Sequence, residues 1–193
     1  GFSQRLGHSD HDIFAVSSDV KCSPYSPRRA LKCIGSCHPS CNPNMTVPVA
    51  NFKDFSAAVL SGGYSWLAFT VVVEKDIGLE SALTMSGLRT TIKSGKSPVL
   101  DAGGSFRPFV INSGSQIKFS GITIRSGSAS GNGGAVSIAG STTNVTFSST
   151  TFEMCTATDS GAGVYSVSAG VELHSSMFTS CTAEHYGGGF YFG

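Results

Sequence analysis

Four of the six cysteines lie in the first 49 residues, where they could either bind a metal or form disulfides. Cys33, Cys37 and Cys41 follow one another closely, His38 adjoins the second of them, and Cys22 lies upstream. Structural zinc sites usually contain cysteine pairs separated by two residues, and this spacing is different. We therefore expect disulfides with no metal and no other cofactor, and the connectivity stays open among three pairings.

The other two cysteines, Cys155 and Cys181, belong to an internal repeat. The segment FEMCTATDSGAGVY at 152–165 aligns with FTSCTAEHYGGGFY at 178–191, and every aligned position is offset by 26 residues. A looser match, ITIRSGSASGNGGAV at 122–136, comes before the first segment, with Ile124 28 residues before Phe152 and Val136 28 residues before Val164. Equal register would place the two cysteines one coil apart, about 4.8 Å between Cα atoms, which a disulfide can span. They are expected to be bonded, or else to be a stacked pair of small buried thiols.

Cysteine content and glycosylation sequons indicate an oxidising compartment. N-x-[ST] sequons occur at Asn44 and Asn144, and together with the cysteines they fit passage through the secretory pathway. We expect a protein that is secreted, at the cell surface or in the extracellular matrix. A net charge of +1 argues against a nucleic-acid binder, which needs a basic stripe. No apolar run reaches the roughly 20 residues of a membrane span.

The repeat length predicts the fold class. Periods of 20 to 50 residues are typical of solenoids, and from about residue 66 onward short strands alternate with Gly/Ser turns. The LxxLxL pattern of leucine-rich repeats is absent, and no helix-length pattern interrupts the strands. We therefore expect an all-β, right-handed parallel β-helix with coils of about 26–28 residues. Inward columns should include Phe152 over Phe178, and Val136 over Val164 over Phe190.

Residues 50–61 are predicted to form one short helix that covers the N-terminal end of the solenoid. Phe52, Phe55 and Val59 recur on one face of a helical period. Asn51 can be its N-cap, and Asp54 favours the helix N-terminus. A helix at this place would cover an otherwise open sheet edge.

We expect two parts: a cysteine-rich, irregular leader or subdomain at 1–49 and the β-helix at 50–193. Because the third GGxF/Y strand is the last segment before Gly193, the solenoid is predicted either to continue in a longer chain or to dock end to end on another subunit. The residues of this predicted assembly edge are Phe190, Tyr191 and Phe192.

The motifs of these coils resemble two known groups of β-helix proteins. The stretch from LTMSGLRTT to GNGGAVSI resembles the opening coils of pectate-lyase-like right-handed β-helices. The later coils resemble the repeats of chlamydial polymorphic outer membrane proteins, which carry GGA[ILV] and FxxN motifs. Here GGAV, GAGV and GGGF occur in successive coils, and FxxC replaces FxxN at Phe152 and Phe178. This resemblance implies adhesion and surface display.

The pectate-lyase-like resemblance also implies an alternative function, a polysaccharide-active lyase, hydrolase or epimerase. Such sites use outer-face acids, often with Ca²⁺, and a basic residue. The candidates are Glu74, Lys75, Asp76, Asp101, Arg107, Lys118, Arg125, Asp159, Glu184 and His185. No two carboxylates recur at one-coil spacing as a paired site, and Asp101 precedes Ala-Gly-Gly, where it would stabilise a turn.

We therefore expect no catalytic site among these residues. The leading hypothesis is a structural β-helix that acts as an adhesin, scaffold or filament subunit. Its expected partners are other protein subunits, through end-to-end or lateral contacts, and glycans.

Overall fold

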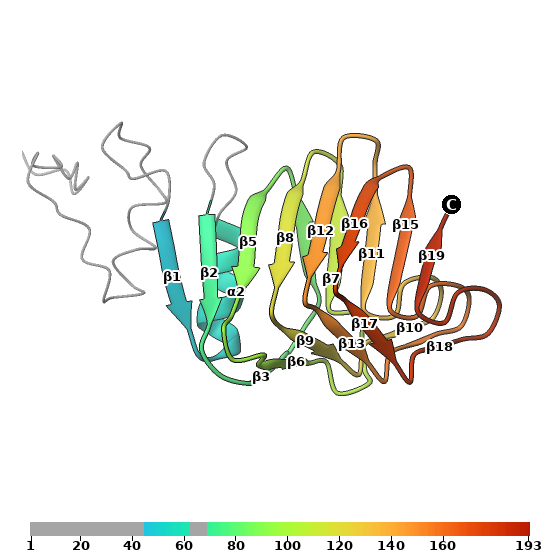
Figure 1. Ribbon diagram of the computed structural model, residues 1–193, viewed down its shortest axis with the longest axis horizontal. Coiled ribbons are helices and arrows are strands. Elements are labelled where there is room, and N and C mark those ends of the chain that lie inside the picture. Colours follow the sequence, from blue (N-terminus) through green and yellow to red (C-terminus); the bar gives the residue numbers. More distant parts are fainter. Residues whose placement is uncertain (1–44, 62–68) are drawn as a thin grey trace, which may run out of the picture.

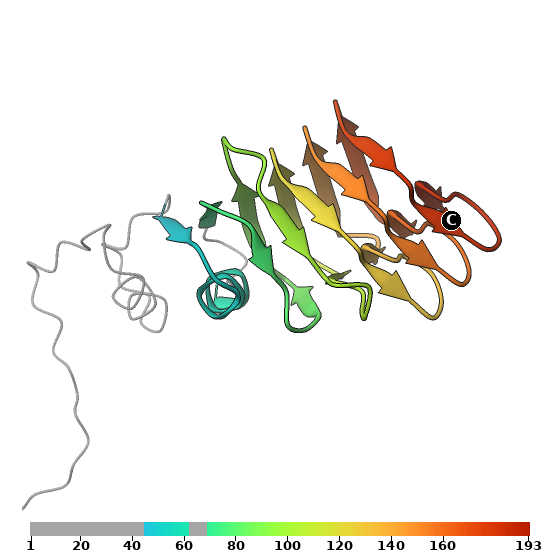
Figure 2. The ribbon, with the colours of Figure 1, turned by 90° about the horizontal axis from the view of Figure 1, so that it is seen from below.

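A computed structural model describes residues 45–61 and 69–193. In these ranges the chain is a parallel β-helix of about 5 turns with one short helix at its N-terminal end (Figure 1). The predicted fold class is confirmed. The coils stack side by side, and the turns of successive coils lie next to one another (Figure 2).

Each full coil contributes one strand to each of three parallel sheets, here called sheets 1, 2 and 4, and the last three coils add a strand to the shorter sheet 3. In stacking order, sheet 1 contains β1 (Met45–Val49), β2 (Phe69–Val73), β5 (Arg89–Lys93), β8 (Gln116–Ser120), β12 (Asn144–Ser148) and β16 (Gly170–His174). Sheet 2 contains β3 (Ile77–Gly78), β6 (Val99–Asp101), β9 (Thr123–Arg125), β13 (Thr151–Glu153) and β17 (Met177–Thr179). Sheet 3 contains β10 (Ser128–Ala129), β14 (Thr156–Ala157) and β18 (Thr182–Ala183). Sheet 4 contains β4 (Leu83–Ser86), β7 (Phe109–Asn112), β11 (Val136–Ala139), β15 (Val164–Val167) and β19 (Phe190–Phe192).

The interior consists of columns of apolar side chains, because alternate residues of every strand point inward. The predicted column Val136, Val164 and Phe190 is present, with each residue paired to the next. Phe152 likewise pairs with Phe178 and stacks on it, with 4.8 Å between ring centroids. The 26-residue offset in the sequence is therefore the true register of the last two coils.

Phenylalanine rings form a continuous chain of contacts through the interior. The rings of Phe109 and Phe119 lie 5.2 Å apart, those of Phe119 and Phe147 lie 5.1 Å apart, and Phe147 meets Phe152 at 5.1 Å. Phe55 of the helix joins this chain through an edge contact with Phe109 at 6.4 Å. Aromatic pairs at such separations stabilise the fold beyond the effect of burying apolar area. This series of ring contacts therefore connects coils that are distant in sequence.

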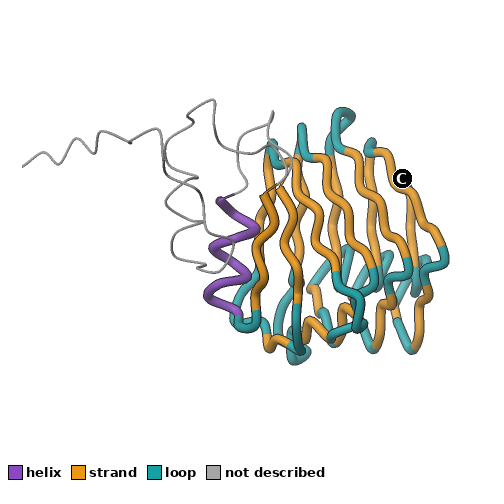
Figure 3. The backbone as a smooth tube through the Cα atoms, turned by 60° about the vertical axis from the view of Figure 1, so that its left-hand side comes forward, coloured by secondary structure: helices purple, strands orange, loops and turns teal. Residues whose placement is uncertain are grey.

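The helix α2 (Phe52–Ser61) lies against the N-terminal end of the coils (Figure 3). Asn51 caps it as predicted: its side-chain oxygen accepts the Asp54 N–H at 2.9 Å, and its amide donates to the Asp54 carboxylate at 2.8 Å. Phe55 and Val59 are completely buried, as the helical period predicts. No helix of the described ranges is long and apolar enough to cross a membrane.

Residues in the left-handed backbone region recur at the corners between sheets. Gly121, Ser149 and Ser175 occupy the corner between sheets 1 and 2 in successive coils, with φ of 64°, 49° and 48°. At Gly121 a Cβ would lie 2.4 Å from the backbone oxygen of Ser94, so only glycine fits there. Met154 has φ of 50° at the next corner, an unusual conformation for a long side chain.

Two of the buried threonines, Thr143 and Thr90, differ in whether their hydroxyl groups have hydrogen-bond partners. Thr143 donates from its turn to the backbone oxygens of Asn112 and Ala139, at 3.0 and 2.9 Å. Thr90 faces the interior from β5 and is 3% exposed, and its hydroxyl has no hydrogen-bond partner. An unpaired buried hydroxyl destabilises the folded state.

The strand β1 was not predicted. Residues 1–49 were expected to be irregular, yet Met45–Val49 pairs in parallel with β2 throughout its length. Sheet 1 therefore begins within the segment assigned to the leader. The described ranges do not include Cys22, Cys33, Cys37 and Cys41, so the predicted disulfides of the leader lie outside them.

Candidate functional site

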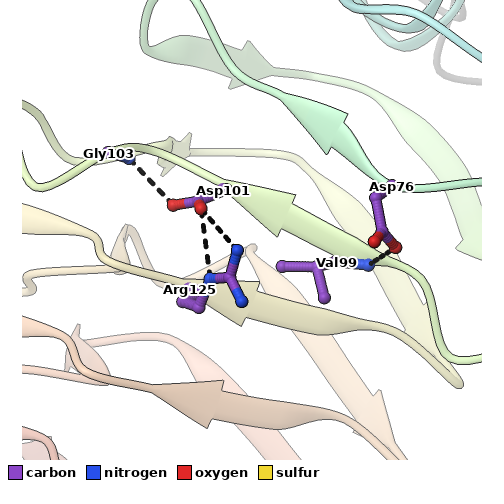
Figure 4. A network of polar contacts seen from close by, with 5 residues as sticks. All are labelled: Asp76, Val99, Asp101, Gly103 and Arg125. Carbon is purple, nitrogen blue, oxygen red and sulfur yellow. Dashed lines mark hydrogen bonds and ion pairs between the residues drawn. The ribbon is translucent and has the colours of Figure 1, made fainter.

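The best-developed polar cluster lies on the outer face of sheet 2, around Asp101 (Figure 4). The Arg125 guanidinium, on the next coil, donates to one Asp101 carboxylate oxygen from Nη2 at 2.7 Å and from Nε at 3.1 Å. The other carboxylate oxygen accepts the Gly103 N–H at 2.9 Å. Asp101 thus stabilises the following turn, as predicted, and also joins its coil to the next.

Electrostatics keeps Asp101 ionised. Partial burial by itself would raise its pKa, but the Gly103 N–H and the Arg125 guanidinium together lower the pKa below its usual value. Arg125 lies between two carboxylates, because its register partners are Asp101 and Glu153. Both side chains of the ion pair are about one-third exposed, which limits its contribution to stability. A carboxylate held ionised and paired in this way is poorly suited to act as a general acid.

Asp76 makes a second contact between coils close to this cluster (Figure 4). Its carboxylate accepts the N–H of Val99 at 2.8 Å, where β6 begins. The interaction joins the turn before β3 to the first residue of the next strand in sheet 2. Asp76 therefore has the same structural role as Asp101.

Arg107 joins coils by another route. Its Nε donates to the backbone oxygen of Gly133 at 2.6 Å, and its Nη2 donates to that of Asn132. Burial lowers the pKa of the guanidinium. The side chain thus ties the loop before β7 to the equivalent loop of the next coil.

Asp159 and His185 meet on the loops of the last two coils. The Nδ1 atom of His185 lies 3.0 Å from the Asp159 carboxylate, which also accepts the Ser160 hydroxyl at 3.1 Å. The contacts from His185 and Ser160 lower the pKa of Asp159. Glu184 precedes the histidine and is exposed.

The remaining candidates are scattered. Glu74 and Lys75 are exposed in the turn before β3, and Lys118 is exposed on the outer face of sheet 1. The structure therefore separates the candidates into small pairs and does not gather them into one catalytic cleft. Within 45–61 and 69–193, no group of three or more His, Cys, Asp or Glu residues is arranged to hold a metal ion.

Cys155 and Cys181 occupy equivalent positions in successive coils and carry free thiols. The backbone confirms this register, since the N–H of Thr182 donates to the oxygen of Cys155 at 2.9 Å. Each thiol donates to a backbone oxygen, Cys155 to that of Glu153 at 3.4 Å and Cys181 to that of Phe152 at 3.5 Å. The neighbouring Cys155 side chain lowers the pKa of Cys181 to about 7, while the interaction with Cys181 and burial raise the pKa of Cys155. The disulfide between them stays a prediction.

The two sequons fall on different parts of the chain. Asn144 is the exposed first residue of β12, so its side chain is accessible to a glycosyltransferase. Asn44 lies outside the described residues. Glycosylation at both positions stays a prediction.

The predicted assembly edge corresponds to β19, which pairs with β15. Phe190 and Tyr191 are partly buried, whereas Phe192 is 60% exposed. Assembly through Phe190, Tyr191 and Phe192 stays a prediction.

Sequence reasoning missed an aromatic cluster on the outer face of sheet 4. Tyr165 and Tyr191 are register partners with parallel rings 5.5 Å apart, and Tyr186 lies 6.2 Å from Tyr191. The alignment had already paired Tyr165 with Tyr191 and had placed the preceding residues, Val164 and Phe190, in an inward column. Successive side chains of a strand point to opposite faces, so this pairing was the available signal that both tyrosines face outward.

No protein-family model, curated protein or solved structure matches the chain.

Proposed function

We propose that the chain is a structural β-helix module of a secreted or cell-surface protein, which acts as an adhesin, scaffold or filament subunit. The observation that carries the proposal is the use of the outer-face ionic groups. Asp76, Asp101 and Arg107 each bind the neighbouring coil. Side chains used in this way stiffen a stack of coils and leave its lateral surface available for contact with partners.

The likeness of the coil motifs to the polymorphic outer membrane protein repeats supports surface display. The exposed sequon at Asn144 supports a glycosylating compartment. An enzymatic role is the competing outcome, because proteins with one fold perform many different functions.

The first experiment compares activity with stability. The full chain and its Asp76→Asn, Asp101→Asn and Asp159→Asn variants are incubated with polygalacturonate, xylan and alginate. Unsaturated products and new reducing ends are then measured. We expect no turnover by any of these proteins, and lower thermal stability in Asp101→Asn. The protein would be shown to be an enzyme if the unmodified chain turned over a substrate and one of these substitutions abolished that activity without unfolding the protein.

The second experiment tests the compartment. The full chain, produced through the secretory pathway of a eukaryotic cell, should gain glycan mass that Asn144→Gln removes in part. Thr143→Ser alters a neighbouring residue but preserves the sequon, so it should leave that mass unchanged. If the secreted protein carries no glycan at Asn144, the sequon no longer supports the proposed compartment.

A further inference from the structure

The tyrosine cluster combines aromatic surface with exposed hydrogen-bonding groups. On β15, Val164 and Ser166 are buried, so Tyr165 between them points outward. Tyr191 repeats this position on β19, and the two rings are almost parallel, with 2° between their planes. Coil-to-coil stacking thus builds a short aromatic ladder on the lateral surface of the solenoid.

Tyr186 extends the ladder sideways and is its most accessible ring. It is 68% exposed and tilted by 31° from Tyr191. The next residue, Gly187, has φ of 58°, and a Cβ there would lie 2.2 Å from the Phe190 backbone oxygen. Glycine therefore allows the loop to close tightly against β19, which places Tyr186 beside Tyr191.

Polar groups border this ring on the loop side. The His185 ring lies 6.4 Å from the Tyr186 ring and contacts the Asp159 carboxylate of the previous coil. The His185 and Asp159 side chains are 63% and 45% exposed, and Glu184 is exposed as well. An accessible aromatic face thus lies beside carboxylate and imidazole groups that can form hydrogen bonds with a ligand.

This combination is specific to the end of the described solenoid. In the two preceding coils, the position of Tyr186 is taken by Ser160 and Asn132, which bond to each other through the Ser160 N–H and the Asn132 side chain. The position of Tyr165 is taken by Ser137 one coil earlier. Because smaller polar residues fit the same backbone, the fold does not require aromatic side chains at these positions.

We propose that Tyr186, with Tyr191, His185 and Asp159, binds a pyranose unit of an uncharged glycan. The C–H face of a pyranose packs on an aromatic ring, and its hydroxyl groups bond to carboxylates and imidazoles at the rim. The carboxylates of Asp159 and Glu184 disfavour sulfated or uronic sugars, because like charges repel. This inference rests on the proposed role as a surface protein and names uncharged glycans as the class of ligand.

The test is titration of the full chain by NMR and calorimetry with mannohexaose, cellohexaose and galactohexaose, and with hexagalacturonate as the charged comparison. At least one neutral oligosaccharide should bind with a Kd near or below about 1 mM, and hexagalacturonate should bind more weakly. Tyr186→Ala should weaken binding at least tenfold, while Tyr186→Trp should restore it. Asp159→Asn should weaken it by a smaller factor.

Met177→Ala is the matched control, because Met177 is 58% exposed on β17 of a different sheet. It should leave binding unchanged. The inference fails if none of the neutral oligosaccharides binds, or if Tyr186→Ala and Met177→Ala bind equally well. It also fails if Tyr186→Ala abolishes self-association of the chain without affecting any sugar. These outcomes leave the proposed structural role intact, whereas glycan cleavage would contradict that role.

Discussion

The interior and the outer surface of this β-helix differ in how much they change from coil to coil. Most inward positions keep an apolar side chain, as in the column of Phe119, Phe147 and Leu173, and the buried Thr90 and Ser166 are exceptions. Outward positions change freely: Asp101, Arg125 and Glu153 are successive register partners. The interior therefore specifies the stacking of coils, and the outer surface is free to acquire contacts and recognition sites.

The largest expected effect is on the interior aromatic chain. Phe147 is completely buried between Phe119 and Phe152, and Phe147→Ala should lower the free energy of unfolding by about 3–5 kcal/mol. Tyr186→Ala, on the outer surface, should change it by less than about 0.5 kcal/mol. Urea unfolding followed by circular dichroism measures both. Equal losses would contradict the contrast between interior and surface.

The next effect concerns the stacked cysteines. A Cys155–Cys181 disulfide should stabilise the oxidised protein by about 3 kcal/mol, because it closes a long loop in the unfolded chain. In the reduced protein, iodoacetamide should label Cys181 before Cys155, with a rate that rises through pH 7 as Cys181 ionises. Peptide mapping distinguishes these sites from the other cysteines. Equal labelling of both thiols, or a midpoint near pH 9, would contradict the lowered pKa of Cys181.

Replacing the buried Thr90 and Thr143 by valine should change stability in opposite directions. Thr90→Val removes an unpaired hydroxyl and should raise the free energy of unfolding by about 1–2 kcal/mol. Thr143→Val removes a hydroxyl that satisfies two backbone oxygens and should lower it by a similar amount. Chemical denaturation of the two variants is the measurement. A loss of stability in Thr90→Val would mean that its hydroxyl has a partner.

The ion pair on sheet 2 should have a smaller, pH-dependent effect. Asp101→Asn should lower the free energy of unfolding by about 1 kcal/mol at pH 7, since the pair is partly exposed. A carboxyl with a lowered folded-state pKa stabilises the protein above its unfolded pKa, about 3.9. That stabilisation is lost as the pH falls through the lowered value.

The difference between Asp101→Asn and the unmodified protein should therefore shrink below about pH 4. Glu80→Gln, which changes another exposed carboxylate, serves as the control for general charge effects. A difference that persists unchanged at pH 2 would exclude the ionised Asp101 as its source.

The smallest effect concerns a corner residue. Met154 has φ of 50° and is 47% exposed, so Met154→Gly should relieve backbone strain and raise stability by about 0.5–1 kcal/mol. Met177→Gly should instead lower stability by about the same amount, because Met177 lies in a strand. Differential scanning calorimetry compares the two midpoints. A lower midpoint for Met154→Gly would show that the methionine packing outweighs the strain.

The sequence predicted the interior better than the surface, for physical reasons. Columns such as Phe152 over Phe178 follow from an offset between similar residues, and the cap at Asn51 follows from local chemistry. The Asp101–Arg125 pair spans 24 residues, a shorter coil than the 26–28 that the later repeats indicate. Which dissimilar residues meet across two coils depends on the length of each coil, and the sequence repeat does not give the length of this earlier coil.

The other omissions have similar causes. The strand β1 is only five residues long and contains Pro48, which argues against a strand inside a sheet. Its buried Val47 and Val49 do alternate with Thr46 and Pro48, but it is the pairing with β2 that identifies the strand. Tyr186 lies in a loop, and its approach to Tyr191 depends on the tight turn at Gly187. Serine at corners such as Ser149 is not a distinctive marker of left-handed backbone.

In-register stacking of the coils is the central claim, and backbone NOEs from the isotopically labelled full chain test it most directly. Cross-strand NOEs should connect Phe119 with Phe147, and Phe147 with Leu173, in the pattern of parallel strands. Antiparallel NOEs between strands adjacent in sequence, such as β8 and β9, would contradict the β-helix and the surface sites that depend on it.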